Sequence, residues 1–457
     1  MATTIPESVG IAVATTSSRF ERARTRYGSK DLEEALGFGI AITCLGAILT
    51  FLQFQPKPPG SSRAGAIPSR SVNAPNFANK NADNSAAPRV VGGAPKVNPL
   101  ERFRIALSQL AKNDARAPLR ILWLGDSHTA GITWPSTVDS ALSSRARSGG
   151  PGYLPLGLPY QRQHGARISS DERFDIAPHP PARRTLEDDG VFGLGGTRAT
   201  PRDKALAITI KLDTNSAAGR ITCQLLFRYQ RQHDRLTIVI AGTTIDVPKD
   251  TGLALPQGLQ IYTFTAPAPA TLEIRAVAGN PELFGLVAEN ELPGLVIDVL
   301  GINGARFATP LAWNEESWKA LVKWRHPSLV VLAYGTNEVF DAVAPSHYLT
   351  DIERLINRLR AAVPDCECLL SGPTDVARGG QAAGERASAI DQIERQAADQ
   401  LGCAYFSPYQ VMGGAQGFDA WLHAPQALAL PDRIHLSALG YRKLGQVMAE
   451  YIGGDSP

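Results

Sequence analysis

The strongest constraint on the fold is a set of five short apolar runs that alternate with helix-like segments, one near residue 120 and four after residue 290. Strands that alternate with helices of this length form a parallel sheet with helices on both faces. We therefore expect an α/β domain. The runs begin at Leu119, Gly294, Ser328, Cys366 and Cys403.

A different pattern interrupts this alternation between residues 190 and 290. Runs such as ALAITIKL and RLTIVIAG alternate polar and apolar residues, and Gly, Pro, Asn and Asp separate them. Strand-type runs without helical patterns between them predict an all-β sandwich. The α/β pattern resumes afterwards, so we interpret residues 190–290 as a domain inserted into a surface loop.

The N-terminal region predicts a membrane anchor. Residues 35–54, ALGFGIAITCLGAILTFLQF, carry no charge and are long enough for one helix to span a bilayer. The basic residues before this stretch predict a cytoplasmic N-terminus and an exported remainder. A cleaved signal peptide is the nearest alternative, but the long arm before the span favours an uncleaved anchor. Residues 55–97 are rich in Pro, Ser, Asn, Ala and Gly, which is typical of a flexible linker.

Length, charge and cysteine content narrow the classes further. A chain of 457 residues is expected to form two or three folded units, and a formal net charge of +3 does not favour nucleic-acid binding. The five cysteines lack the spacing of a zinc site, so no metal is expected. An exported domain can form disulfides, and Cys403 is then expected to pair with Cys366 or Cys368 if their strands are neighbours.

Polar clusters follow the first three strands, at the sheet edge where ligands bind in open α/β folds. Ser127 lies in Gly-Asp-Ser-His after the first strand, Gly304 follows the second, and Asn337 follows the third. Asp432 and His435 lie three residues apart near the C-terminus. Taken singly, each of these residues is more typical of a turn, a loop or a helix cap. Together they predict a common site.

These residue types suit nucleophilic catalysis of acyl transfer. Ser127 supplies a hydroxyl, His435 is the base, and Asp432 orients the imidazole and stabilises its charge. The backbone N–H groups of Ser127 and Gly304, with the side-chain amide of Asn337, are the candidate donors to the oxyanion.

The chain resembles the SGNH (GDSL) hydrolase superfamily. Its characteristic Ser, Gly, Asn and His correspond to Ser127, Gly304, Asn337 and His435, and its Asp-x-x-His element corresponds to Asp432–His435. The resemblance implies a flavodoxin-like three-layer fold without a metal or organic cofactor. The stretches GDSHTAG, GGPGYLPLG, GINGA and DRIHLSALGY resemble bacterial peptidoglycan O-acetylesterases, which carry a carbohydrate-binding-like, jelly-roll-like sandwich inserted in the SGNH domain.

This resemblance implies a serine esterase that removes acetyl groups from a glycan, such as peptidoglycan or an exopolysaccharide. His128, Gly414 and Trp421 are the candidate substrate-pocket residues. An O-acetyltransferase working with a membrane acetyl-donor partner, a lipase or thioesterase, and a non-catalytic component of an envelope polysaccharide assembly are the alternatives. The expected location is the inner membrane, through one helix, with the catalytic part in the periplasm or outside.

The predicted organisation divides the chain into six segments. In order, they are a cytoplasmic arm (1–33), a transmembrane anchor (34–54), a linker (55–97), the first part of the hydrolase domain (98–189), the β-sandwich (190–290) and the second part of the hydrolase domain (291–457).

Overall fold

The computed structural model describes most of the chain from residue 98 onward. The described residues are 98–156, 160–163, 165–170, 174–176, 189–201, 207–214, 216, 218–251, 253–341 and 344–454. The chain divides into two units, residues 1–89 and 90–457, and all described residues lie in the second. The predicted arm, anchor and linker therefore lie outside the described residues. No helix in the described part is both long and apolar enough to cross a bilayer.

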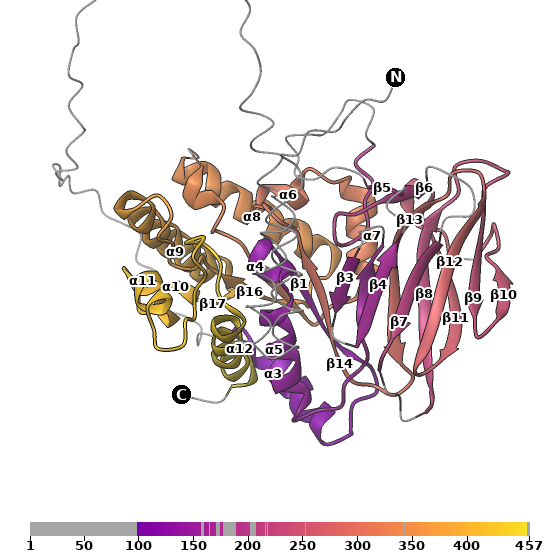
Figure 1. Ribbon diagram of the computed structural model, residues 1–457, viewed down its shortest axis with the longest axis horizontal. Helices are drawn as coiled ribbons and strands as arrows, with labels where there is room; N and C mark the ends of the chain where they lie inside the picture. The colour runs from indigo at the N-terminus through magenta and orange to yellow at the C-terminus, as the bar shows by residue number, and fades with distance from the viewer. Residues whose placement is uncertain are drawn as a thin grey trace, which may run out of the picture. The chain divides into compact units, whose positions relative to one another are not determined.

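A parallel five-stranded sheet forms the centre of the α/β domain (Figure 1). The strand order β14-β1-β15-β16-β17 places the second strand of this sheet outside the first, which is the flavodoxin-like order. The expected parallel α/β fold is thus confirmed. The strands are β1 (Leu119–Gly125), β14 (Leu295–Gly301), β15 (Leu329–Ala333), β16 (Glu367–Ser371) and β17 (Ala404–Phe406).

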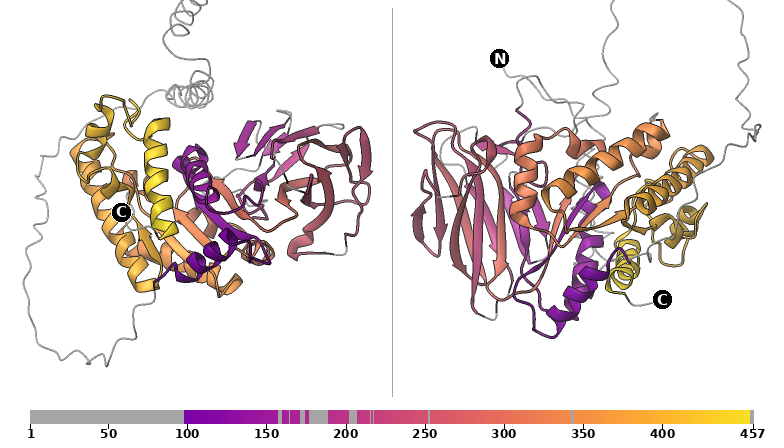
Figure 2. Two further views of the ribbon diagram at one scale, coloured as in Figure 1. Left: turned by 90° about the horizontal axis from the view of Figure 1, so that it is seen from below. Right: turned by 180° about the vertical axis from the view of Figure 1, so that it is seen from behind.

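Helices cover both faces of this sheet. Successive residues of a strand point to opposite faces, and the strand residues here are apolar on both, so both faces must be buried. Ile121 and Trp123 of β1 join the core under one group of helices, and Leu122 and Leu124 join the core under the other. Figures 1 and 2 show the resulting three layers. The first group is α3 (Glu101–Ala111), α5 (Thr133–Ser143) and α12 (Ala438–Gly453), and the second is α7 (Glu315–Arg325), α8 (Pro345–Ala362) and α9 (Gln381–Leu401).

Short helices lie in the connections around the sheet. They are α4 (Ser127–Ala130), η2 (Pro256–Gly258), α6 (Ala308–Leu311), η3 (Glu338–Phe340), α10 (Pro408–Val411) and α11 (Gly417–Leu422).

Ser127 does not begin one long helix; two helices follow β1. The short α4 ends at Gly131, and Ile132 has a left-handed backbone with φ of 55°. Helix α5 then starts at Thr133, with Pro135 in its first turn. Proline lacks a backbone N–H and is tolerated there, but it breaks a helix interior.

Two antiparallel sheets lie beside the α/β domain. One has the order β10-β9-β12-β7-β4-β3, and the other has the order β11-β8-β13-β6-β5 with β2 also paired to β13. The bounds are β2 (Gly152–Pro155), β3 (Tyr160–Gln163), β4 (Ala166–Ser170), β5 (Phe174–Ile176), β6 (Ala199–Pro201), β7 (Ala207–Leu212), β8 (Arg220–Arg228), β9 (Arg235–Ile240), β10 (Thr243–Asp246), β11 (Gln260–Pro267), β12 (Ala270–Ala278) and β13 (Glu282–Asn290).

These sheets take in more of the chain than the segment 190–290 expected from the sequence. Strands β2 to β5, all before residue 190, pair within them. The two sheets share one apolar core, to which Cys223, Leu225 and Phe227 of β8 contribute from one side and Ile238 of β9 from the other.

The sheet that contains β8 and β13 is buried on both faces. Leu226 and Phe284 point away from the core between the two sheets and join the α/β core instead. The hydroxyl of Tyr153 donates to the carbonyl of Phe284 at 3.0 Å. Burial on both faces explains why eight of the nine β13 residues are buried, whereas β12 alternates.

A buried ion-pair network crosses the same boundary. Arg325, at the end of α7, pairs with Asp298 of β14 at 2.6 Å and with Glu289 of β13 at 2.6 Å. Arg120 of β1 pairs with Glu289 at 2.8 Å. The network ties the parallel sheet, α7 and β13 together.

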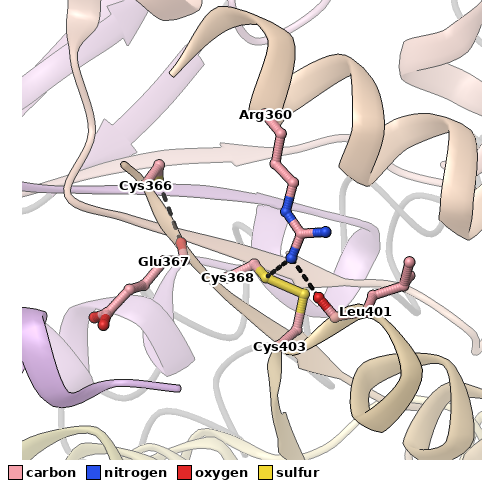
Figure 3. The surroundings of a disulfide bond; sticks show 6 residues. All are labelled: Arg360, Cys366, Glu367, Cys368, Leu401 and Cys403. Carbon is pink, nitrogen blue, oxygen red and sulfur yellow. Dashed lines mark hydrogen bonds between the residues drawn. A yellow bond between two sulfur atoms is a disulfide. The ribbon is translucent and has the colours of Figure 1, made fainter. Parts of the chain in front are cut away.

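A disulfide joins Cys368 of β16 to Cys403, next to β17 (Figure 3). The two strands are neighbours in the sheet, so the expected pairing of Cys403 is confirmed with Cys368 as its partner. The thiols of Cys366 and Cys223 are free. Arg360 of α8 lies over the disulfide and donates to the carbonyl of Leu401 and to Cys368 Sγ.

Candidate active site

The turn that follows β1 carries the candidate nucleophile. Asp126 caps α4 by accepting a hydrogen bond from the backbone N–H of His128 at 2.9 Å. Ser127 is the first residue of α4, at the carboxyl end of a central strand. Gly125 is required because a Cβ there would lie 2.1 Å from Thr129 Oγ1 and 2.8 Å from the Ala333 carbonyl.

The structure brings Ser127, His435 and Asp432 into one hydrogen-bonded line. Ser127 Oγ lies 2.8 Å from His435 Nε2, and His435 Nδ1 lies 2.7 Å from Asp432 Oδ2. The other Asp432 oxygen accepts from the backbone N–H groups of Ile434 and His435, at 3.0 and 2.9 Å. Arg433, between Asp432 and His435, has φ of 65°, a left-handed backbone that lies in the turn joining the two residues.

Asp432 is held in its charged form. Burial by itself raises the pKa of this carboxyl, but hydrogen bonds from the His435 ring and from two backbone N–H groups outweigh burial and lower the pKa to about 2. An ionised carboxylate is therefore available to accept the His435 Nδ1 proton throughout the neutral range.

Two backbone donors face the site without an acceptor. The N–H groups of Ser127 and Gly304 donate to no residue in the described part of the chain. Gly304 has φ of 78°, and a Cβ at this position would meet no atom within 4 Å. Its N–H is thus open to a ligand oxygen.

Asn337 lies between the two turns. Its side-chain nitrogen donates to the Ala305 carbonyl at 3.0 Å and makes a longer contact of 3.4 Å with Asp126 Oδ2. The second N–H is only weakly engaged, so the amide can donate to a ligand. Burial raises the pKa of Asp126 to about 7.

Glu338 joins the loops that carry Gly304 and Asn337. Its carboxyl accepts from the backbone N–H of Phe307 at 3.0 Å and of Gly335 at 3.2 Å. Burial raises its pKa to about 7, while the hydrogen bonds from the backbone lower it. The sequence does not indicate this role for Glu338, because the two N–H groups that donate to its carboxyl cannot be identified before the loops are folded.

His128 is buried against the site and does not bond Ser127. Its Nδ1 pairs with the hydroxyl of Tyr441 of α12 at 2.9 Å, and its Nε2 has no partner in the described part of the chain. Burial, followed by the nearby His435, lowers the pKa of His128 to about 3, so the ring is neutral. Tyr441 was not expected from the sequence, because its contact depends on how α12 packs.

The other two pocket candidates lie apart from this line. Trp421 of α11 is buried in the core beneath α12, with Lys443 over its ring at 5.3 Å. Its ring therefore packs in the core, which is the alternative to a pocket role. Gly414 lies in the turn after α10, where its N–H donates to the Tyr409 carbonyl at 2.9 Å. No group of three or more metal-binding side chains is found among the described residues.

The fold and this site resemble those of GDSL-type hydrolases, and a comparison with family models found a similarity to them. Residues 264–443 match the model of the GDSL-like Lipase/Acylhydrolase family. The match takes in Gly304, Asn337, Asp432 and His435 and begins after Ser127. No curated protein matches the chain.

A comparison with solved structures found a similar fold. A peptidoglycan O-acetylesterase aligns over 79% of this chain and 98% of its own, with 22% identity and a TM-score of 0.66. A lipase/acylhydrolase from Enterococcus faecalis aligns over 35% of this chain and 76% of its own, with 18% identity and a TM-score of 0.28. An acetyl xylan esterase aligns over 34% and 80%, with 20% identity and a TM-score of 0.27. The last two scores support no conclusion about this chain.

Proposed function

We propose that this protein is a membrane-anchored, exported serine esterase that removes O-acetyl groups from a glycan. The observation that carries the proposal is the unbroken line from Ser127 Oγ through His435 to Asp432, at 2.8 and 2.7 Å. Distances of this size between nucleophile, base and orienting acid are those of an activated serine.

In the first half of the reaction, Ser127 Oγ attacks the acetyl carbonyl carbon and passes its proton to His435 Nε2. The N–H groups of Ser127 and Gly304, with the Asn337 amide, stabilise the oxyanion. The intermediate collapses, the bond from the carbonyl carbon to the sugar oxygen breaks, and His435 gives its proton to that oxygen. The products are a free sugar hydroxyl and an acetyl-Ser127 ester.

In the second half, His435 takes a proton from water as the water oxygen attacks the acetyl-serine carbonyl. Collapse of this intermediate returns the proton to Ser127 Oγ and releases acetate. Asp432 stabilises the imidazolium in both halves.

A glycan substrate is supported by the fold shared with a peptidoglycan O-acetylesterase over nearly all of that protein's length. Export and anchoring rest on the uncharged stretch at residues 35–54. The Cys368–Cys403 disulfide also favours an oxidising compartment outside the cytoplasm.

The test is acetate release from a panel of acetylated glycans, with Ser127→Ala and a matched control, Ser144→Ala. Ser144 is an exposed serine at the end of α5. We expect Ser127→Ala to lose nearly all turnover and fluorophosphonate labelling, while Ser144→Ala keeps both. Activity in Ser127→Ala would contradict the proposal. Acetyl transfer to a sugar acceptor, with little release to water, would identify a transferase instead.

A further inference from the structure

Two loops face Ser127 across the site, and they are cross-linked. The loop after β14 carries Gly304, and the loop after β15 carries Asn337. The Asn337 side chain donates to the Ala305 carbonyl, and the Glu338 carboxyl accepts from the Phe307 N–H. Both of these contacts are buried or partly buried.

A third cross-link lies nearer the surface and involves a charged pair. Arg306 of the first loop makes a two-pronged contact with Asp341 of the second, through Nε to Oδ2 and through Nη2 to Oδ1 at 2.8 Å. The remaining arm of the guanidinium, Nη1, donates to the carbonyl of Gly304 at 2.7 Å. One side chain thus holds the Asp341 carboxylate and the Gly304 carbonyl together.

The Ala305 N–H donates to the Ile302 carbonyl at 3.0 Å and closes the turn that contains Gly304, and Arg306 holds the Gly304 carbonyl itself. A glycine is conformationally free, and nothing within 4 Å would meet a Cβ at this position. The direction of its N–H therefore depends on hydrogen bonds to the loop. A planar guanidinium with donors in a fixed fork sets the geometry of two acceptors at once, which a single ammonium cannot do.

We propose that Arg306 and Asp341 are positioning residues, which lock the Gly304 loop so that its N–H is aimed at the oxyanion before substrate binds. The inference rests on the proposed esterase function. Arg306 acts through Gly304: its three nitrogens already have protein partners, so it is not assigned a substrate contact. Preorganised donors accelerate acyl transfer because they need no rearrangement as charge develops.

The location of the pair makes the proposal testable by substitution. The side chains of Arg306 and Asp341 are 34% and 23% exposed, so their loss does not open a buried cavity. Arg167 and Asp213 form a comparable exposed pair on the antiparallel sheets, at 2.7 Å. Arg167→Gln is therefore the matched control.

The experiment measures kcat and KM for acetyl-ester hydrolysis, together with hydrogen exchange in residues 302–307. In Arg306→Gln we expect kcat to fall about 10- to 100-fold with KM nearly unchanged, since small displacements of catalytic groups cost this much. Exchange in residues 302–307 should accelerate. The double variant Arg306→Gln/Asp341→Asn should match Arg306→Gln alone, and Asp341→Asn alone should lose less.

Arg306→Lys keeps the positive charge but removes the planar guanidinium, so it tests whether the two-pronged geometry or only the charge is needed. We expect it to lose kcat as Arg306→Gln does, whereas Arg167→Gln keeps wild-type kinetics. Wild-type kcat in Arg306→Lys or Arg306→Gln would overturn the proposal, as would a loss confined to KM. Unchanged exchange would overturn it even if no ester is turned over. Absence of acetate release by the wild-type protein would contradict the proposed function and leave exchange to decide the positioning role.

Discussion

The rings of His128 and His435 lie 5.3 Å apart beside Ser127, yet only His435 bonds the serine hydroxyl. His128 turns instead to Tyr441 of α12. Two neighbouring imidazoles therefore have separate tasks, one toward the nucleophile and one toward the helix that follows the His435 loop.

The pH dependence of activity should not depend on His128. Burial lowers the pKa of His128 to about 3, so its ring is neutral above about pH 4. We expect His128→Asn to leave the acidic limb of kcat/KM within about half a pH unit of wild type. A larger displacement of that limb would mean that His128 titrates in the working range.

Asp432→Asn should abolish most activity without unfolding the protein. An amide is neutral, so it does not stabilise the imidazolium, and its NH₂ group can hold His435 in the wrong tautomer. We expect kcat to fall by about 10³- to 10⁴-fold. Circular dichroism should remain that of the wild type. A fall of less than about tenfold would show that Asp432 is not the orienting acid.

The buried carboxyl of Asp126 should make the protein less stable as the pH rises. Its pKa is about 7 in the folded protein and 3.8 ordinarily, so the folded state holds a proton that the unfolded state releases. The corresponding stability is fully present below about pH 4 and is lost as the pH approaches 7. Denaturant unfolding of Asp126→Asn from pH 4 to 8 should show a smaller decline than wild type. An unchanged decline would contradict this assignment.

The ion-pair network at the boundary of the two sheet systems should be sensitive to loss of its central arginine. Arg325→Met leaves the buried Asp298 carboxylate without its charged partner and leaves Glu289 with Arg120 alone, which costs about 3–5 kcal/mol. Arg167→Met, at the exposed pair, should change the free energy of unfolding by at most about 1 kcal/mol. If the two substitutions lower the free energy of unfolding equally in denaturant titrations, the buried network does not stabilise the protein more than an exposed ion pair.

Removal of the disulfide should weaken the edge of the parallel sheet. Cys403→Ser opens a link that closes 35 residues of chain, which is worth about 2–4 kcal/mol. Peptide mapping of the unreduced protein should recover Cys368 linked to Cys403. Recovery of a Cys366–Cys403 peptide instead would contradict the pairing.

The parallel sheet could be predicted because each strand leaves a local sign in the sequence. An apolar run that ends in Gly-Asp-Ser or Gly-Thr-Asn predicts both a strand and a polar edge, which places Ser127 and Asn337 there. Gly304 follows the second apolar run in the same way. The spacing of Asp432 and His435 is likewise local. Those signals need no knowledge of which distant segments meet.

The residues that support the site were missed because their roles depend on contacts between loops. Nothing near Arg306 in the sequence indicates that Asp341, 35 residues away, receives its guanidinium. Tyr441 reads as an ordinary apolar position of α12 until the helix is packed against His128. Trp421 had two interpretations in the sequence, a sugar contact or a core position, and packing against the helices places it in the core.

The strands β8 and β13 contribute to two cores at once, which restricts the substitutions that either core can accept. Phe284 and Leu226 belong to the hydrolase core although they lie on strands of the antiparallel sheets. Excision of residues 190–290 would leave Tyr153 and the network around Arg325 without their partners. The two parts share one interior surface, so a substitution on either side of it constrains the residues that the other side accepts.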